Sequence, residues 1–273
     1  GLAVHSLLHP LKQLTDAMDK VGRGDMAARV PVESNDELGD LADNFNDMLD
    51  DLNQAQSMRD LFGRYVSQEV AAQVLKDGAH LGGMTVQATA LFADIRDFTG
   101  LSERLPAQDV VNILNRYYTR MVDVVVAEGG IVNKFGGDSL LAIFGAPIRQ
   151  PDHALRAVRA AWQMQRAVAA FNAEQSAMSL PPLTIGIGIS SGDVIAGNVG
   201  GEARLEYTVI GDPVNLASRL QSLTKEWGMP VLLSENTQSL VGEGKADVQP
   251  RERIAVRGKK QPTLIYELCG VAA

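Results

Sequence analysis

The stretch from Ala90 to Thr99 constrains the fold of this chain more than any other, because it places a carboxylate directly after a buried strand. Residues 85–92 are apolar enough for such a strand, and Asp94 follows where the strand is expected to end. A second carboxylate, Asp138, stands in a Gly-Gly turn between two further β-like runs. An acid at a strand end and another on an adjacent hairpin can share a hard cation. Mg²⁺ binds proteins in this way, through one or two carboxylates and the phosphates of a substrate.

The composition predicts a folded chain of about two domains, since 273 residues exceed the usual size of one. Hydrophobic residues make up 45% of the sequence, which is enough for a core, and the formal net charge of −8 argues against a nucleic-acid partner. Cys269 is the single cysteine, so there is no internal disulfide and a reduced cytoplasmic setting is expected. No run of about 18 apolar residues could span a bilayer. The chain starts at Gly1 inside an amphipathic pattern, so we expect a fragment of a longer protein.

The first 60 residues carry two short helical seams, in which apolar residues recur at spacings of three and four. The seams consist of Leu7, Leu11, Leu14, Met18 and Val21, and of Leu38, Leu41, Phe45, Met48 and Leu52. An extended connector around residues 30–32 separates them, and Asn35 or Asp36 can cap the second helix. Because two short seams cannot bury themselves alone, a parallel dimer with four helices is expected.

This N-terminal stretch resembles a HAMP domain over about residues 5–55, because His9-Pro10-Leu11 precedes the first helix seam and Asp36-Glu37-Leu38-Gly39 opens the second. A generic helical dimerisation stalk is the alternative interpretation. HAMP modules usually follow a membrane helix and relay a signal through helix packing. The resemblance therefore implies the cytoplasmic portion of an inner-membrane protein whose transmembrane and sensor region lies upstream. The helical pattern continues towards Asp77-Gly78, which is expected to end it.

From residue 81 the sequence alternates between strand and helix patterns. The expected order is a strand over 85–92, a helix over 106–128, a hairpin of 131–135 and 140–144, a helix over 152–173, a strand over 183–190, a short strand over 207–210, a helix over 213–224, and strands over 231–233, 253–256 and 264–268. This order predicts an α+β fold of the ferredoxin-like kind, with an antiparallel-rich central sheet and flanking helices.

Five blocks of this half are similar, in the same order, to those of class III nucleotidyl cyclase catalytic domains. The blocks are Phe92-Ala93-Asp94-Ile95-Arg96, Asn133-Lys134-Phe135-Gly136-Gly137-Asp138, Gly192-Asp193-Val194, Val214-Asn215-Leu216-Ala217-Ser218-Arg219-Leu220 and Val256-Arg257-Gly258-Lys259. The resemblance covers about residues 84–269. Together, the two resemblances imply a HAMP domain over 1–55, a helical linker over 56–80 and a cyclase catalytic domain over 81–273.

The resemblance also implies a reaction, in which the ribose 3′-oxygen attacks the α-phosphorus of a nucleoside triphosphate and pyrophosphate leaves. By resemblance, Asp94 and Asp138 bind two Mg²⁺ or Mn²⁺ ions, and the Ile95 carbonyl adds a ligand. Backbone N–H groups near Phe98 and Thr99 would face the phosphates. The common family pattern has glycine at position 97, where this chain has an aspartate that should repel a triphosphate.

Lys134 and Thr208 match the two family positions that read the purine. A lysine donates to the adenine ring nitrogen and cannot donate to the protonated ring nitrogen of guanine. Guanylyl cyclases usually place glutamate and cysteine at these positions, so ATP is the expected substrate and cyclic AMP the product. Threonine at position 208 further resembles the bacterial subgroup that includes bicarbonate-responsive enzymes.

Asn215 and Arg219 lie four residues apart and so share one face of a helix. By resemblance, the amide orients the ribose and the guanidinium stabilises charge on the α-phosphate. Arg257 matches a cationic position that contacts the terminal phosphates, although Lys259 and Lys260 are close enough to leave this choice open. In this family one protomer supplies the metal carboxylates and the other supplies the purine readers. One chain here holds both sets, which implies a homodimer with two composite sites.

Three alternatives stay open at this point. The chain could be a guanylyl cyclase, or a non-catalytic dimerisation and signalling module descended from a cyclase. Such modules typically lack a metal acid or the transition-state arginine, and this chain retains both. The turn at 135–139 is also similar to the Gly-Gly-Asp-Glu-Phe turn of diguanylate cyclases, but Ser139-Leu140 replaces Glu-Phe here.

Overall fold

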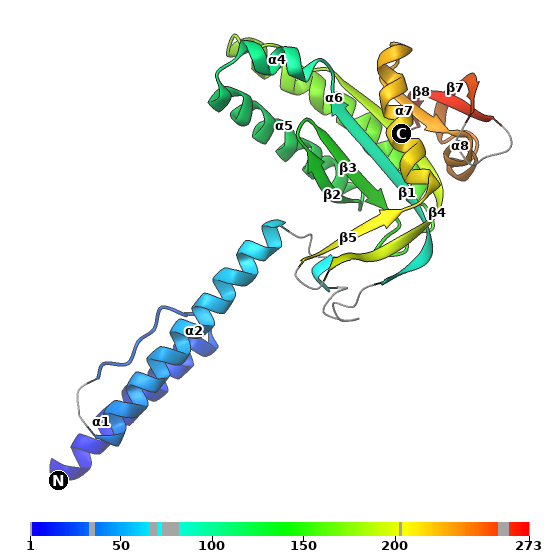
Figure 1. Ribbon diagram of the computed structural model, residues 1–273. Helices are drawn as coiled ribbons and strands as arrows, with labels where there is room; N and C mark the ends of the chain where they lie inside the picture. Colours follow the sequence, from blue (N-terminus) through cyan, green and yellow to red (C-terminus); the bar gives the residue numbers. More distant parts are fainter. Residues whose placement is uncertain are drawn as a thin grey trace. The chain divides into compact units, whose positions relative to one another are not determined.

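The computed structural model describes residues 2–32, 36–65, 70–72, 82–201, 204–255 and 262–272 (Figure 1). The chain forms two compact units, Gly1–Val66 and Ser67–Ala273. The expected end of the linker helix at Asp77-Gly78 lies outside the described residues, as does Asn35.

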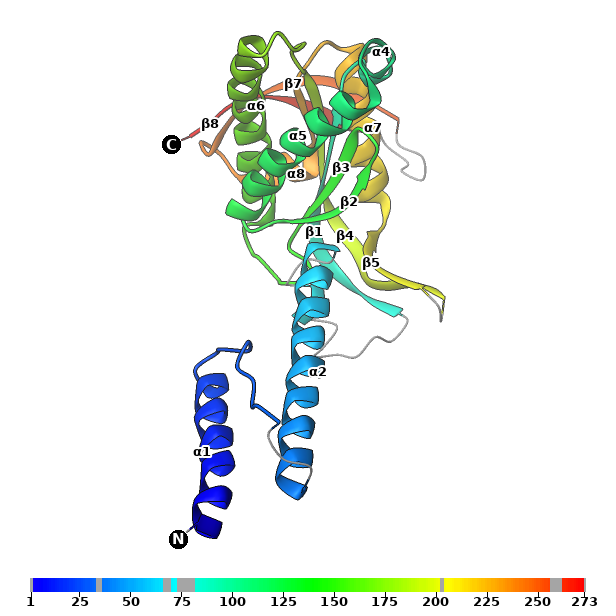
Figure 2. The same cartoon turned by 90° about the vertical axis from the view of Figure 1, so that its left-hand side faces the viewer.

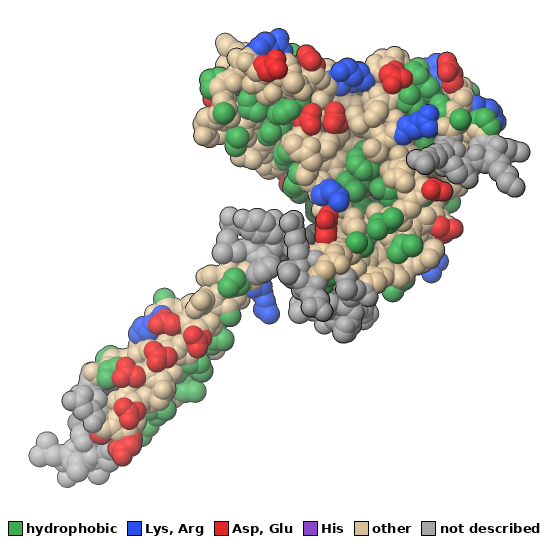
Figure 3. All heavy atoms as spheres, viewed as in Figure 1, with side chains coloured by type: hydrophobic (Ala, Val, Ile, Leu, Met, Phe, Trp, Pro, Cys, Tyr) green, Lys and Arg blue, Asp and Glu red, His purple; other side chains and the backbone are tan. Residues whose placement is uncertain are grey.

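The N-terminal unit is a pair of helices, α1 (Leu2–Gly22) and α2 (Glu37–Tyr65). Asp36 caps α2, because its Oδ1 accepts hydrogen bonds from the backbone N–H groups of Leu38 and Gly39 at 3.1 and 3.3 Å. The small core consists of Ala17, Val30, Ala42, Phe45 and Leu49. Figure 3 shows acidic side chains on the surface of this unit. The exposed acids of α2 include Glu37, Asp40, Asp43, Asp47, Asp50 and Asp51.

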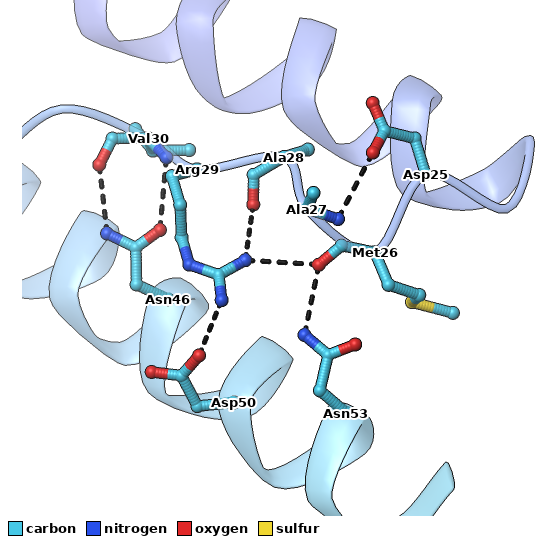
Figure 4. A network of polar contacts seen from close by, with 9 residues as sticks. All are labelled: Asp25, Met26, Ala27, Ala28, Arg29, Val30, Asn46, Asp50 and Asn53. Carbon is cyan, nitrogen blue, oxygen red and sulfur yellow. Dashed lines mark hydrogen bonds and ion pairs between the residues drawn. The ribbon is translucent and has the colours of Figure 1, made fainter. Parts of the chain in front are cut away.

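Many seam residues of this unit stay on its surface. The exposed seam residues are Leu11, Met18, Leu41, Met48 and Leu52. A connector over 23–32 returns along α2 and is tied to it by side chains (Figure 4). The Asn46 amide exchanges two hydrogen bonds with the backbone of Val30, at 2.9 and 3.0 Å, and Arg29 pairs with Asp50 at 2.5 Å.

The C-terminal unit is built on one eight-stranded sheet with the order β2-β3-β1-β4-β6-β8-β7, in which β5 also pairs with β4. The strands are β1 (Gly82–Ile95), β2 (Ile131–Gly136), β3 (Ser139–Phe144), β4 (Ile185–Gly201), β5 (Arg204–Ile210), β6 (Val231–Ser234), β7 (Ala246–Ile254) and β8 (Thr263–Val271). The helices are α4 (Phe98–Arg104), α5 (Ala107–Ala127), α6 (His153–Ala177), α7 (Asp212–Glu226) and α8 (Glu235–Val241). The predicted α+β class, with an antiparallel-rich sheet and flanking helices, is confirmed.

Strand alternation sorts the side chains of this sheet onto two faces. In β4, Ile185, Ile187 and Ile189 join the main core with α5 and α6, whereas the intervening glycines face α7. Figure 2 shows α5 and α6 on one side of the sheet and α7 on the other. A Cβ at Gly188 would lie 2.2 Å from the Ala217 carbonyl oxygen, so only glycine lets α7 approach this closely.

Several boundaries differ from the sequence prediction. Strand β1 starts at Gly82, three residues before the predicted strand, because it pairs with β4 along its whole length. Strand β4 continues to Gly201, because its last residues pair with β5. Strand β7 starts seven residues before the predicted strand at 253–256. The short helices α4 and α8 were not predicted, since each is only 7 residues long.

Candidate active site

The two predicted metal-binding acids lie together at one corner of the sheet. Asp94 is the penultimate residue of β1 and pairs with Ser139 on β3. Asp138 lies in the hairpin turn and immediately precedes Ser139. The Ile95 N–H donates to the Asp138 carbonyl oxygen at 3.2 Å. Because its neighbours Ala93 and Ile95 are buried against the α5 and α6 side, Asp94 points to the opposite face.

The electrostatics of this corner fit a cation site. Burial, followed by the charge of Asp138, raises the pKa of Asp94 from 3.8 to about 6, while Lys225 acts in the opposite direction. Two neighbouring carboxylates form a hard oxygen donor set whose charge a divalent cation would neutralise. Among the described residues, no group of three or more His, Cys, Asp and Glu side chains could hold a metal.

Tyr118 on α5 supports the hairpin tip that carries Asp138. Its hydroxyl donates to the Gly137 carbonyl oxygen at 2.8 Å and lies 3.1 Å from that of Ser139. Burial, followed by the charges of Asp138 and Asp94, raises the pKa of Tyr118 to about 12, so the hydroxyl keeps its proton. The ring also packs on Phe135, with centroids 4.4 Å apart. Sequence reasoning took Tyr118 only as part of an apolar helix face.

The backbone explains the unexpected Asp97. This residue has φ 55° and ψ 33°, the left-handed conformation, immediately before α4. Glycine adopts this conformation without strain, and Asp and Asn tolerate it better than other residues. The Asp97 carboxylate folds back beside Gly100, where an added Cβ would meet its oxygens at 3.1 Å. Phe98 and Thr99 begin α4, and the first bond of the helix runs from the Leu101 N–H to the Asp97 carbonyl oxygen, so the N–H groups of Phe98 and Thr99 have no acceptor within the helix.

The predicted purine readers stand on two strands that approach each other. Lys134 lies on β2, where its Nζ pairs with Glu206 on β5 at 2.9 Å. Thr208 lies two residues further along β5 and donates from Oγ1 to the Asn133 Oδ1 at 3.1 Å. Asn133 in turn donates from Nδ2 to the Tyr207 carbonyl oxygen at 2.6 Å. The structure therefore brings Lys134 and Thr208 together, and it adds Asn133 and Glu206, which sequence reasoning had not singled out.

The predicted pair on α7 faces outward. Asn215 and Arg219 are both exposed, whereas Leu216, Ala217 and Leu220 are buried beneath them. Arg219 donates to the Ala255 carbonyl oxygen at 2.6 Å. The candidate phosphate contacts Arg257, Lys259 and Lys260 closely follow Ala255 and lie outside the described residues.

Within one chain, Asp94 lies near the C-terminal end of α7, whereas Asn215 lies near the N-terminal end of that helix. Asp94 is in register with Gly186, where an added Cβ would meet Thr224 near the end of α7. Asn215 precedes Thr224 by about 14 Å along the helix axis. One chain therefore does not place its ribose-orienting candidate beside its own carboxylates.

Arg96 fixes the end of β1 against α7. Its guanidinium donates to the carbonyl oxygens of Thr224 and Met229, at 3.0 and 2.5 Å. These carbonyls lie at and beyond the C-terminal end of α7, where a cation is favoured. Arg96 therefore links the strand that carries Asp94 to the helix that carries Arg219, a role that its place in the sequence block did not reveal.

Comparison with known proteins decides the family. Residues 84–270 match the family described as the adenylate and guanylate cyclase catalytic domain, and residues 2–54 match the HAMP domain. The chain belongs to the class III cyclase family. The uncharacterized protein Rv1319c of Mycobacterium tuberculosis is 39% identical over 258 residues, which are 93% of this chain and 46% of that protein. The chain thus spans about half the length of the curated relatives it matches.

Solved cyclase structures agree with this assignment. The guanylyl cyclase Cya2 is 38% identical with a TM-score of 0.65, over 70% of this chain and 96% of that one. The adenylyl cyclase CyaB from P. aeruginosa is 33% identical with a TM-score of 0.64, over 70% of this chain and 98% of that one. Both family resemblances drawn from the sequence are confirmed. Throughout the described ranges, no helix has the length and apolar character needed to cross a membrane.

Proposed function

We propose that this cyclase is an adenylate cyclase, which converts ATP to 3′,5′-cyclic AMP and pyrophosphate. The observation that carries the proposal is that contacts between β2 and β5 involve both predicted purine readers: Lys134 pairs with Glu206, and Thr208 bonds to Asn133. A lysine ammonium can only donate, which suits the unprotonated ring nitrogen of adenine and not the protonated one of guanine. A guanylyl cyclase remains the second candidate, because the similar structure Cya2 is described as one.

The carboxylate corner would hold the metals of the reaction. Asp94 and Asp138, with the Ile95 carbonyl, are the proposed ligands for two Mg²⁺ or Mn²⁺ ions. When bound, such ions make the 3′-oxygen more nucleophilic and neutralise the phosphates. Tyr118 keeps the Asp138 turn in place, and Arg96 fixes the strand end beside α7.

The remaining proposed roles belong to side chains around the nucleotide. Asn215 orients the ribose, and Arg219 stabilises the charge that builds on the α-phosphate. The N–H groups of Phe98 and Thr99 face the phosphates. Arg257 or Lys259 contacts the terminal phosphates.

The active form is proposed to be a homodimer, in which one protomer offers its acids and the other offers Lys134, Thr208, Asn215 and Arg219. The separation of Asn215 from Asp94 within one chain supports this arrangement. The proposed division is a HAMP signal-relay domain over 1–55, a helical linker over 56–80 and a catalytic domain over 81–273. The exposed seam residues of the N-terminal helices support dimeric packing there. The parent protein is proposed to be anchored in the inner membrane, with this part in the cytoplasm.

Product analysis tests the proposal directly. The chain is incubated with ATP or GTP and with Mg²⁺ or Mn²⁺, and cyclic nucleotides are separated by chromatography. Cyclic AMP as the main product is the expected result. Cyclic GMP alone would identify a guanylyl cyclase, and no product from either nucleotide, with no nucleotide binding, would favour a non-catalytic module.

A further inference from the structure

Asn133 lies at an irregularity of β2 that turns its side chain towards β5. Val132 pairs with Ala142 and Lys134 pairs with Leu141, so Asn133 has no partner of its own in the β2–β3 register. Such bulges re-aim a side chain and often occur beside functional sites. Here the re-aimed amide reaches the backbone of Tyr207 and the hydroxyl of Thr208.

The chemistry of these two contacts fixes the direction of each hydrogen bond. The Tyr207 carbonyl oxygen can only accept, so the Asn133 nitrogen must be the atom 2.6 Å from it. The amide oxygen is therefore the atom that faces the Thr208 Oγ1 at 3.1 Å. Because this oxygen can only accept, the Thr208 hydroxyl must donate. A hydroxyl has one proton, so Thr208 retains only lone pairs for any further partner.

We propose that Asn133 is a positioning residue for nucleotide selectivity, which acts by making Thr208 an obligate hydrogen-bond acceptor towards the purine. The inference rests on the proposed function and adds to it that Thr208 faces position 6 of the base. The 6-amino group of adenine donates and meets this acceptor. The 6-oxo group of guanine or hypoxanthine accepts, so two acceptors would face each other there.

Lys134 supplies the complementary half of the pattern. Its Nζ has three protons and uses one on Glu206 at 2.9 Å, so donors remain for a ligand. Strand β2 thus presents a donor from Lys134, and β5 presents an acceptor from Thr208. Adenine offers the reverse arrangement, with an acceptor at the ring nitrogen and a donor at the 6-amino group.

The test measures the selectivity for ATP over inosine 5′-triphosphate (ITP), which has the 6-oxo group without the 2-amino group of guanine. The full chain is assayed for kcat/KM with both nucleotides. The Kd values of their 3′-deoxy forms, which lack the attacking oxygen, give a second readout that needs no turnover. Asn133→Ala frees the Thr208 proton to donate to a 6-oxo group. The ATP/ITP ratio is expected to fall about fivefold, chiefly through tighter ITP binding.

Two further variants separate selectivity from folding. Asn133→Asp keeps an acceptor for Thr208 but cannot donate to Tyr207, so the ratio should stay within about twofold of wild type although the melting temperature falls. In a Thr208→Val background, Asn133→Ala should leave the ratio unchanged, because the hydroxyl that it controls is gone.

The outcomes distinguish this inference from the proposed function. Suppose that wild type prefers ATP. If Asn133→Ala then leaves the ATP/ITP ratio unchanged, or changes it equally in the Thr208→Val background, the positioning role of Asn133 is wrong, whereas the proposed adenylate cyclase function is unaffected. If wild type binds and converts the 6-oxo nucleotides better than ATP, both the proposed function and the inference fail.

Discussion

The two halves of the candidate site are organised in different ways. The carboxylate corner is set by backbone pairing, with Asp94 fixed in the β1–β3 register and the Asp138 turn held by Ile95 and Tyr118. The nucleoside face is built from side chains that meet across strands or extend from α7 into solvent. The corner is therefore preorganised by the fold. The nucleoside face includes exposed groups, Lys134, Asn215 and Arg219, whose placement we expect to depend on a ligand or a second chain.

The sharpest way to test the corner is to remove one acid. Asp94→Ala should lower kcat by at least about 10³-fold, because one carboxylate cannot hold two metals beside the phosphates. Asp97→Asn is a matched control, since it removes a nearby acid but tolerates the left-handed backbone. It should keep most activity. Retained cyclisation by a folded Asp94→Ala protein would contradict the metal assignment.

The second prediction tests whether the two halves come from different chains. Arg219→Ala should lower kcat by about 10²- to 10³-fold, since it removes charge stabilisation at the α-phosphate. Mixing this variant with Asp94→Ala should restore up to about a quarter of wild-type activity, because half of randomly formed dimers carry one intact site. Ser222→Ala, also exposed on α7, is the control. Absence of complementation between active-site variants that do dimerise would argue for a site within one chain.

The third prediction sharpens the nucleoside face alone. Lys134→Glu with Thr208→Cys should lower kcat/KM for ATP by about 10²-fold, since the donor to the ring nitrogen is lost. The new glutamate would face Glu206, which pairs with Lys134 at 2.9 Å in wild type. Adding Glu206→Lys should therefore recover stability and improve GTP use relative to the double variant. Unchanged ATP turnover in the double variant would refute the purine assignment.

The smallest effect concerns the stability of the corner without metal. The pKa of Asp94 is raised from 3.8 to about 6, so the folded chain binds this proton more tightly than the unfolded chain. Wild type should therefore gain stability relative to Asp94→Asn as the pH falls from 7 to 4. The gain should be about 1–2 kcal/mol after discounting solvent screening. Urea unfolding at several pH values measures this.

Metal linkage gives the companion measurement. At pH 7 without divalent cations, Asp94→Asn should melt above wild type, because the unfavourable charge is gone. Mg²⁺ should raise the melting temperature of wild type and leave that of the variant almost unchanged. Equal stabilisation of both proteins by Mg²⁺ would place the cation elsewhere.

The sequence predicted the parts of the molecule that depend on local pattern. The β2–β3 hairpin, α5, α6 and α7 lie within a few residues of their expected positions, because hydrophobic periodicity and turn residues define them. The family motifs also identified Asp94 and Asp138 before their proximity was visible. Extension of β1 and β4 was missed, since it depends on pairing between distant segments.

The roles of site residues that act through tertiary contacts also could not be predicted from the sequence. Tyr118, Arg96, Asn133 and Glu206 each matter here through a partner far away in the chain. Asp97 was noticed but had no explanation until its positive φ was known. An aspartate where the family pattern implied by the resemblance has glycine is a local signal, and left-handed backbone was its simplest interpretation.

The close packing of α7 against Gly188 limits which positions of this domain can be substituted without loss of folding. Any side chain at that position would collide with the backbone at Ala217 and Gln221, so mutation there lifts the whole helix. The outward residues of the same helix carry no such restriction. A mutational library confined to exposed positions of α7, β2 and β5 should therefore yield folded proteins with altered substrate preference, whereas libraries that include Gly188 should be dominated by insoluble clones.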